Sequence, residues 1–289
     1  MKIPGTSIGV DDFSGNNTEY YALTHYHSDH RKGLRKGDTR PIICSTITKK
    51  LLMGLNDVPE DNITTIDPGQ EIPLPGKITI KAFDANHCPG AVMFLFTVRG
   101  RKYLHTGDFR YCPQHDCYQE LFDGIDTLFV DSTFKSDEGN YNHPTQEAAI
   151  DQIIELINNN GDKTIFIGLY QIGKNKIIQA IYNKLGIKVY VNEERRFVYS
   201  LIGMDEAVTT DPDQSRIKGY SMYYFYNYFK LKYPNYKNDS IVIIPTGWSY
   251  NRNNRDGFYY IPYSEHNSSV ELKQFIEKVM PSHIVETNL

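Results

Sequence analysis

Three histidines and one aspartate fall within the six residues HYHSDH, at positions 25–30 of the chain. This cluster follows an apolar run of four residues that predicts a buried β-strand. Because side chains two residues apart lie on the same face of an extended segment, His25 and His27 can bind one cation. A turn after the strand would direct Asp29 and His30 toward a second, neighbouring cation. The fold must therefore place this segment at a strand end, where other parts of the chain complete the cluster.

The donor atoms of this cluster are imidazole nitrogens and carboxylate oxygens, without a thiolate. Such a set is typical of a zinc site that keeps one position open for water. The alternative is a solvated polar loop that happens to be rich in histidine. The whole chain has nine histidines, and three of them stand in these six positions. This concentration favours the metal site and indicates a hydrolase.

The length of 289 residues allows one elaborate domain or two smaller ones. The N-terminus has no apolar signal region, and the longest strongly apolar run, residues 91–98, is too short to span a bilayer. We therefore expect an intracellular protein. The four cysteines are too few for a disulfide framework. Cys112 and Cys117 flank His115, where free thiols in a loop are a simpler interpretation than an accessory metal site.

Charge is unevenly distributed along the chain, whose net charge is −4. Residues 161–260 contain 14 Lys and Arg against 9 Asp and Glu, a balance of +5, and the remainder has a balance of −9. A carboxylate-rich body that binds metal, joined to a basic segment, is what an enzyme acting on a polyanion needs. The asymmetry by itself is also compatible with ordinary solvated surfaces.

The apolar pattern divides the chain into a body, an insert and a return to the body. The body predicts strands at 78–83, 92–98, 102–105 and 127–130, and helices at 145–156 and 268–280. The insert alternates a strand at 164–169, a helix at 176–185 and a strand at 187–191, with a further strand at 241–245, which indicates a parallel α/β unit. Aromatic residues at 220–233 alternate with Lys230 and Lys232. Packing on the insert explains these aromatics better than stacking on nucleobases does.

Two more metal ligands are expected at the ends of predicted strands. His87 follows one strand in a tight Pro-Gly turn, and Asp108 follows another. A carboxylate at a strand end can bridge two metals held about 3.5–4 Å apart. The expected ligands are His25, His27 and His87 for the first metal and Asp29 and His30 for the second, with Asp108 between the two metals.

The segments THYHSDH (24–30), DANHCPGA (84–91) and HTGDFR (105–110) resemble the metallo-β-lactamase superfamily. Three more segments, VDSTF (130–134), PTGW (245–248) and PYSEHNSS (262–269), resemble its β-CASP branch and the DNA cross-link repair nucleases that include Artemis. IPGT (3–6) and YQIGK (170–174) fit the same family. The resemblance runs almost from end to end.

This resemblance implies an α/β fold, a metallo-β-lactamase αβ/βα sandwich with an inserted α/β β-CASP domain. Residues 1–150 and 255–289 would form the metallo-β-lactamase domain, and residues 151–254 the β-CASP domain. The resemblance places His25, His27, His87 and Asp108 in a first zinc site and Asp29 and His30 in a second. It implies one or two zinc ions per chain, with another divalent metal as an alternative in the second site.

Further roles in the reaction follow for residues outside the metal ligands. The resemblance implies that Asp131 orients His266, which contacts the scissile phosphate or the leaving oxygen, and Asp29 joins them as a catalytic residue. We expect six side chains to bind substrate phosphates: Arg110, Lys135, Lys174, Lys176, Ser264 and Ser268. The two serines are equally suited to capping the helix that follows them.

The implied function is a zinc-dependent deoxyribonuclease, a 5′-to-3′ exonuclease acting on 5′-phosphorylated DNA in cross-link or end repair. We expect a monomer that binds DNA, single-stranded or with free 5′ ends, and no membrane. Its place would be the nucleus or another intracellular site of DNA replication and repair, and a viral origin is also open. An Artemis-like endonuclease and an RNA-processing β-CASP ribonuclease stay open as alternatives.

Two rival classes explain the sequence less well, and one position departs from the family pattern. A small-molecule metallohydrolase would not need the basic insert, and a binding scaffold without catalysis should have lost ligands. DNA-specific relatives typically carry a valine after the last strand, and RNA-processing relatives a histidine, where this chain has Asn288. The completion of the second metal site therefore differs from both patterns.

Overall fold

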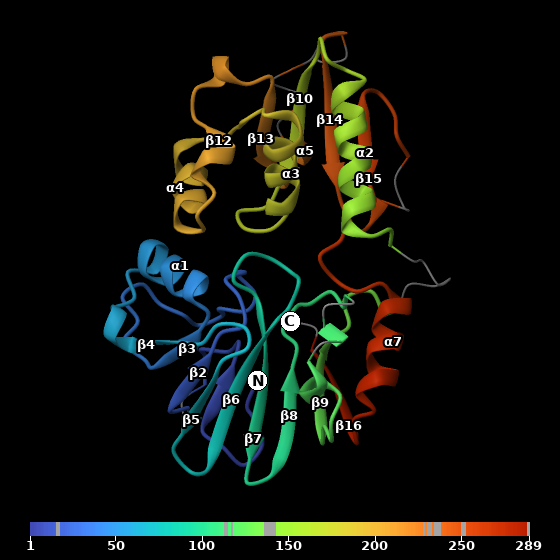
Figure 1. The fold of residues 1–289 in the computed structure, drawn as a ribbon. Helices are drawn as coiled ribbons and strands as arrows, with labels where there is room; N and C mark the ends of the chain where they lie inside the picture. The colour runs from blue at the N-terminus through green and yellow to red at the C-terminus, as the bar shows by residue number, and fades with distance from the viewer. Residues whose placement is uncertain are drawn as a thin grey trace. The chain divides into compact units, whose positions relative to one another are not determined.

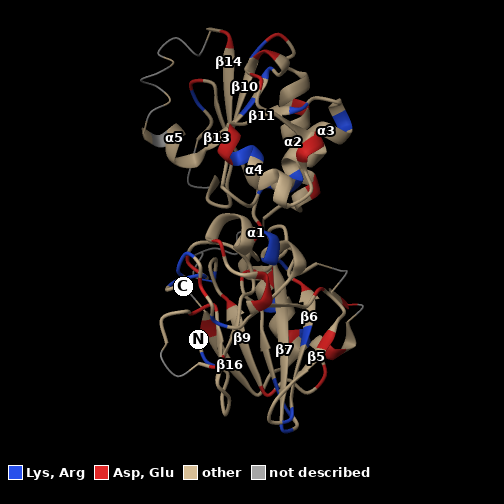
Figure 2. Ribbon diagram, turned by 90° about the vertical axis from the view of Figure 1, so that its left-hand side faces the viewer, with Lys and Arg blue, Asp and Glu red and all other residues tan. Residues whose placement is uncertain are grey.

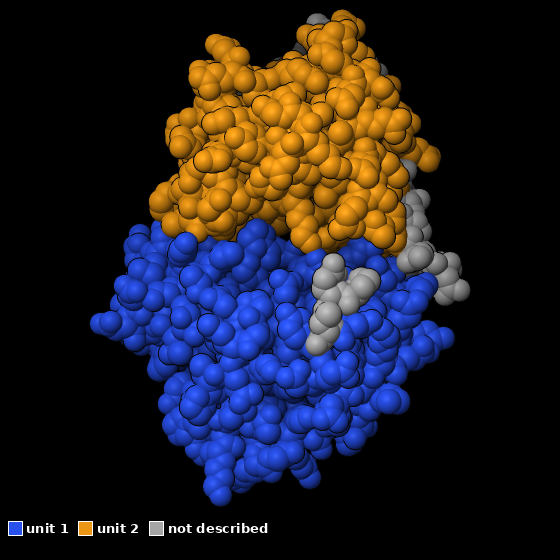
Figure 3. Space-filling view, in the orientation of Figure 1, with its two compact units in different colours: residues 1–142, 266–289 blue, residues 143–265 orange. Residues whose placement is uncertain are grey.

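The structure is a computed structural model of the chain. It describes residues 1–15, 18–112, 115–116, 118–135, 143–227, 229, 233, 238–249 and 253–287. The chain divides into two compact units, unit 1 with residues 1–142 and 266–289 and unit 2 with residues 143–265 (Figure 3). The expected domain limits at 150/151 and 254/255 stay a prediction, as does the folding of either unit alone.

Unit 1 contains two β-sheets. The first has four parallel strands in the order β1-β2-β3-β4: β1 (Ile8–Val10), β2 (Tyr20–Ala22), β3 (Ile42–Cys44) and β4 (Ile63–Thr65). The second has six strands in the order β16-β9-β8-β7-β6-β5: β5 (Glu71–Leu74), β6 (Ile78–Asp84), β7 (Val92–Val98), β8 (Arg101–His105), β9 (Thr127–Asp131) and β16 (His283–Thr287). Strands β5 to β8 are antiparallel, and β9 pairs in parallel with both β8 and β16.

One apolar core joins the two sheets of unit 1. Val10 and Ile43 from the first sheet pack in the same buried cluster as Ile80, Phe94 and Phe129 from the second. Helix α1 (Thr46–Asn56) lies beside the first sheet, and helix α7 (Ser269–Val279) lies beside the β9–β16 edge of the second (Figure 1). The described part of the unit also contains two short 3₁₀ helices, η1 (Glu60–Asn62) and η3 (Gln119–Leu121).

Unit 2 is built on one parallel sheet. Its strands, in the order β12-β11-β13-β10-β14-β15, are β10 (Thr164–Leu169), β11 (Val189–Tyr190), β12 (Val208–Thr209), β13 (Ile217–Ser221), β14 (Ser240–Pro245) and β15 (Phe258–Ile261). Its helices are α2 (Gln146–Asn158), α3 (Asn175–Leu185), α4 (Glu193–Leu201), α5 (Met222–Asn227), η4 (Asp205–Ala207) and η5 (Pro212–Gln214). The α/β sandwich with an inserted parallel α/β unit is the predicted fold class, which the structure confirms.

Alternate residues of strand β10 point into two separate cores. Ile165 and Ile167 pack with the apolar faces of α2 and α3, while Phe166 packs with Phe225 and Phe229 on the opposite face. This alternation follows from the period of two in a strand. The described members of the aromatic run at 220–233 therefore belong mainly to a core, as expected, and Lys230 and Lys232 lie outside the described residues.

Local sequence explains several element ends. Ser268 caps α7 with a capping box: its hydroxyl accepts from the Glu271 N–H, and the Glu271 carboxylate accepts from the Ser268 N–H. Arg99 and Gly100 both have positive φ in the β7–β8 hairpin, which suits a tight two-residue turn. The predicted strand 187–191 is shorter in the structure, at Val189–Tyr190, because the chain turns into the Asn192 cap of α4. Among the described residues, no helix is long and apolar enough to cross a membrane.

Gly107, directly before Asp108, lies where the chain passes close to the histidine segment. Its φ is +54°, and a Cβ there would come within 2.6 Å of the Thr24 hydroxyl oxygen. We expect Gly107→Ala to lower the free energy of unfolding by about 2–4 kcal/mol, the sum of left-handed strain and overpacking. Urea denaturation of metal-free protein measures this loss.

Gly100→Ala is the matched control for this prediction. Gly100 also has a positive φ, +88°, but a Cβ there meets nothing within 4 Å. The control should therefore show only the cost of the left-handed conformation, about 1–2 kcal/mol. An equal loss in both variants would show that the approach of Gly107 to Thr24 has no energetic consequence.

Candidate metal centre

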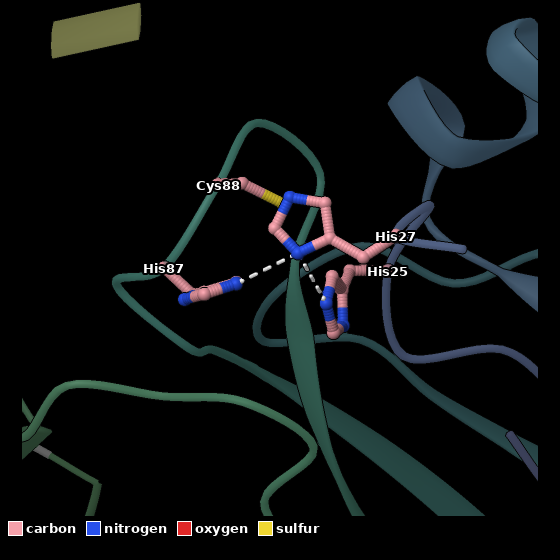
Figure 4. A group of neighbouring side chains, drawn as sticks. All are labelled: His25, His27, His87 and Cys88. Carbon is pink, nitrogen blue, oxygen red and sulfur yellow. Dashed lines mark hydrogen bonds between the residues drawn. The ribbon is translucent and has the colours of Figure 1, made fainter. Parts of the chain in front are cut away.

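Three histidine rings converge beyond the end of strand β2. His25 and His27 lie in the loop after this strand rather than on it, and His87 lies in the turn after β6. The Nδ1 atom of His27 is 3.0 Å from Nε2 of His25 and 3.1 Å from Nε2 of His87 (Figure 4). Nitrogens at these separations can share one cation, as the sequence predicts.

Asp108 faces two groups of histidines with its two oxygens. Its Oδ1 lies 3.1 Å from Nε2 of His30, and its Oδ2 lies 3.6 Å from Nε2 of both His25 and His87. This is the arrangement expected of a carboxylate that bridges two metals. Asp29 lies at the margin, with its Oδ2 3.9 Å from Nε2 of His30 and its side chain 53% exposed.

The electrostatics of the centre suit a neutral imidazole at His25 beside an ionised carboxylate at Asp108. Burial lowers the pKa of His25 well below its ordinary value, so this ring is neutral and can offer a lone pair. Burial raises the pKa of Asp108, but the neighbouring imidazoles of His266 and His30 outweigh it and hold this pKa well below its usual range. Asp108 is therefore an anion that can bind a metal.

The structure adds Asp11, which the sequence analysis did not select. Its Oδ2 lies 2.8 Å from Nδ1 of His30, and its Oδ1 accepts from the backbone N–H of Thr24 at 2.8 Å. Asp11 is only 2% exposed. Its bond to Nδ1 leaves Nε2 of His30 directed at Asp108, as an outer carboxylate does for a metal-bound histidine. The sequence offers one indication of Asp11, a carboxylate directly after a short apolar strand, whereas Asp108 comes three residues after its strand.

Asp11 also determines the protonation of His30. Burial lowers the pKa of His30, but the carboxylates of Asp11 and Asp108 outweigh it and raise the pKa to about 11. Without metal the ring therefore carries a proton on both nitrogens at neutral pH. A metal that binds Nε2 must displace one of these protons, so metal binding at His30 is expected to release a proton.

Replacement of Asp11 by asparagine tests this positioning role. We expect Asp11→Asn to weaken zinc affinity by about 10–100-fold, the usual effect of removing such an outer carboxylate. Competition with a chromophoric zinc chelator measures the affinity. Asp12→Asn is the control, because this neighbouring side chain is 42% exposed and its carboxylate accepts a hydrogen bond from the Ser14 N–H. Equal zinc affinity in both variants would contradict the role of Asp11.

Cys88 is a second residue that the sequence analysis left out of the ligand set. Its sulfur belongs to a group with one ligand atom each of His25, His27 and His87, all within 4.8 Å of one another (Figure 4). The side chain is 7% exposed. The donor set near the first site therefore includes a thiol as well as imidazoles, and only its position next to His87 in the sequence signalled this.

Asp131 and His266 form a hydrogen-bonded pair at the edge of the same centre. Asp131 ends strand β9, and His266 precedes α7. Their Oδ2 and Nδ1 atoms lie 2.7 Å apart, and the other oxygen of Asp131 accepts from Thr133 N at 2.9 Å. Nε2 of His266 lies 4.0 Å from Oδ2 of Asp108. The pair therefore presents an oriented imidazole to the metal centre.

Comparison with known proteins agrees with this geometry. Residues 18–166 match the beta-lactamase superfamily domain, and residues 204–288 match the DNA repair metallo-beta-lactamase domain. The chain belongs to the DNA-repair branch of the metallo-β-lactamase superfamily. The resemblance inferred from the motifs is confirmed, and the His–Asp cluster is typical of the metal site in this superfamily.

Its relatives in this family are longer proteins. The DNA cross-link repair 1A protein of Mus musculus is 35% identical over 99% of this chain, which spans 30% of that protein's length. The 5' exonuclease Apollo of Gallus gallus is 32% identical over 98% of this chain, and the chain spans 62% of that protein's length. A solved structure of a protein of unknown function from Enterococcus faecalis V583 has the same fold, with a TM-score of 0.68 at 15% identity, over 94% of this chain and 76% of that one.

The predicted substrate-binding residues of unit 1 mostly have structural partners. Arg110 is 3% exposed, and its guanidinium donates to the Glu271 carboxylate at 2.9 Å. Ser268 is fully buried and caps α7, which is the alternative that its sequence position allowed. Lys135 forms an ion pair with Glu286 near the β16 edge. A role for these three in binding substrate stays a prediction.

The remaining predicted substrate-binding residues belong to unit 2. Lys174 is 3% exposed, and its ammonium donates to the Pro245 carbonyl. Lys176 donates to the Gln146 side chain at 2.6 Å, and Ser264 is buried with its carbonyl accepting from the same Gln146 side chain at 3.1 Å. Gln146 therefore ties two of these residues to the start of α2, and their role at a substrate stays a prediction.

The alternative metal site around His115 stays a prediction, although Sγ of Cys112 lies 3.8 Å from Nδ1 of His115. Nε2 of His115 lies 2.8 Å from the Asp84 carbonyl oxygen, and its Nδ1 accepts from the Cys112 N–H at 3.2 Å. Both ring nitrogens thus bond to backbone. Cys117 and Asn288 lie outside the described residues, so the expectations for them stay predictions.

Proposed function

We propose that this chain is a zinc-dependent phosphodiesterase, a 5′-to-3′ exonuclease acting on 5′-phosphorylated DNA in cross-link or end repair. The observation that carries the proposal is the position of Asp108. Its two oxygens face the His25–His87 group and His30, and the Asp131–His266 pair lies beside it. Relatives named DNA cross-link repair 1A protein and 5' exonuclease Apollo support DNA as the substrate class.

Six side chains would hold the metal. His25, His27 and His87 would bind a first zinc ion, Asp29 and His30 a second metal, and Asp108 would bridge them. Bound zinc would activate water near neutral pH and neutralise charge on the phosphoryl oxygens. The ligand set fits this role, because it joins imidazoles, among them the neutral ring of His25, to the ionised Asp108 carboxylate in a largely buried cluster.

Asp131 and His266 would orient the catalytic ring and supply the proton for the reaction. The Asp131 carboxylate accepts from Nδ1 of His266 and fixes the direction of the ring. Nε2 of His266 then faces the metal centre, where it can donate to a phosphate oxygen or to the leaving oxygen. His266 is thus the proposed catalytic residue, and Asp131 acts through it as a positioning residue. Thr133 holds Asp131 with two hydrogen bonds, at 2.9 and 2.6 Å.

A DNA strand labelled at its 3′ end tests the proposed polarity. We expect a 5′-phosphorylated strand to give a ladder that shortens from the 5′ end over time, and a 5′-hydroxyl strand to react much more slowly. A single internal cut would instead indicate an endonuclease. Faster cleavage of a matched RNA strand would contradict the assignment of DNA.

A further inference from the structure

Three neighbouring strands of unit 2 each lead to an exposed aromatic side chain. Strands β13, β10 and β14 are adjacent and parallel, so their carboxyl ends lie at one edge of the sheet (Figure 1). Tyr170 directly follows β10, Tyr223 is the second residue after β13, and Trp248 is the third after β14. Their exposed fractions are 49%, 65% and 46%. We call these three side chains the aromatic edge.

The exposure of the aromatic edge contrasts with the aromatic core beside it. Tyr223 and Phe225 belong to the same short helix, α5, yet Phe225 is 5% exposed and lies in the same buried cluster as Phe166. Helix α5 therefore contributes Phe225 to the core, while the Tyr223 side chain lies at the surface. Adjacent strands are about 4.7–4.9 Å apart, so side chains from three neighbouring strand ends can meet one short extended ligand.

Two basic side chains of unit 2 contact Tyr170, one at its ring and one at its backbone carbonyl. The Lys174 ammonium lies 4.1 Å from the centroid of the Tyr170 ring, and the Arg195 guanidinium donates to the Tyr170 carbonyl oxygen. Lys174 is itself buried and fixed by the Pro245 carbonyl. Burial lowers the pKa of Lys174 to about 7, so this group is partly protonated at neutral pH. The Tyr170 ring therefore has the Lys174 amino group on one side, while about half of the residue stays open to solvent. A nucleobase stacked on this ring gains the base–aromatic stacking attraction, and the contact with Lys174 fixes the ring in place.

The net charge of the insert sequence and the topology of its sheet are both compatible with a nucleic-acid ligand. Residues 161–260, which include all three aromatics, carry a balance of +5 in a chain of net charge −4. Acidic and basic residues are neighbours on α4, so their charges largely offset one another on this helix (Figure 2). Open parallel α/β sheets bind ligands at the carboxyl ends of their strands. Stacking on aromatic rings is a sequence-tolerant way to hold single strands.

We propose that Tyr170, Tyr223 and Trp248 form a stacking surface for the bases of single-stranded DNA. The inference rests on the proposed function, because that function supplies DNA as the substrate. It assigns a role to unit 2: the aromatic rings hold the bases, and the Lys174 amino group lies against the Tyr170 ring.

Trp248 provides the measurement, because it is the only tryptophan of the chain. The intact protein with its metal is titrated with a nuclease-resistant phosphorothioate oligothymidylate while tryptophan emission is followed. We expect quenching with this strand and none with an abasic phosphorothioate strand of equal length and charge. Tyr170→Ala and Tyr223→Ala should each weaken binding about tenfold, which corresponds to roughly 1.4 kcal/mol. Tyr170→Phe and Tyr223→Phe keep the ring and should restore the affinity.

Two results would overturn the stacking surface: equal binding of the abasic strand, or unchanged affinity in both alanine variants. The nuclease assay on 5′-phosphorylated DNA, run on the same preparation, separates this inference from the proposed function. Nuclease activity without base-dependent quenching contradicts the stacking surface alone. Base-dependent quenching without nuclease activity supports the surface and contradicts the proposed function.

Discussion

Asp108→Ala is expected to remove nearly all hydrolysis of 5′-phosphorylated DNA. The carboxylate faces His25 and His87 with one oxygen and His30 with the other, so its loss would open both proposed metal positions at once. Metal ions contribute several kcal/mol to stabilising charge in such reactions, and roughly 4 kcal/mol corresponds to a thousandfold lower kcat/KM. Steady-state cleavage and elemental analysis of the purified variant measure activity and bound metal together.

Asp123→Ala is the matched control for the bridging carboxylate. Asp123 is 82% exposed, and its side chain pairs with Lys102 near strand β8. This variant should keep both its zinc content and its rate. If Asp108→Ala retained activity under defined metal concentrations, the metal centre would have been assigned to the wrong residues.

His266→Ala is expected to slow the reaction by about 10²–10⁴-fold, the range for loss of a positioned acid or base. Zinc content should stay unchanged, because His266 is not among the proposed ligands. The loss should appear in kcat rather than in KM, since the proton transfer belongs to the transition state. Added imidazole should restore part of the rate by occupying the space of the missing ring.

Two further variants define the pair of Asp131 and His266. Asp131→Asn should also lower kcat, but less than His266→Ala, because it weakens the orientation of the ring without removing it. His283→Ala is the histidine control, since this side chain is exposed on strand β16. A kcat of His266→Ala equal to that of the His283→Ala control would contradict a catalytic role for His266.

The ligand types of the centre could be read from the sequence because their pattern is local. His25, His27 and His30 stand within six residues after an apolar strand, and that spacing brings them together whatever the rest of the chain does. The long apolar run of β7 and the Arg99–Gly100 turn likewise identify a hairpin from neighbouring residues alone. Family motifs then supplied His87 and Asp108, which local spacing suggested more weakly.

Pairings between distant residues could not be read in this way. Asp131 and His266 are separated by 135 positions, and Asp11 and His30 by 19. A carboxylate meets a particular histidine only when strand order and loop closure bring two strand ends to the same place. Arg110 shows the same limit, because its contact with Glu271 of α7, 161 positions away, cannot be read from neighbouring residues.

The sequence alone thus determined the chemistry of the centre, the parallel α/β character of the insert and the family. Those properties depend on residue type and on spacing along the chain, both of which are printed in the sequence. The tertiary structure decided that Asp11 orients His30, that Cys88 joins the first cluster, and that the aromatics after β13, β10 and β14 end at one edge. Each of these depends on which strand ends become neighbours, and the order of strands in a sheet is set by the packing of the whole unit rather than by any single segment.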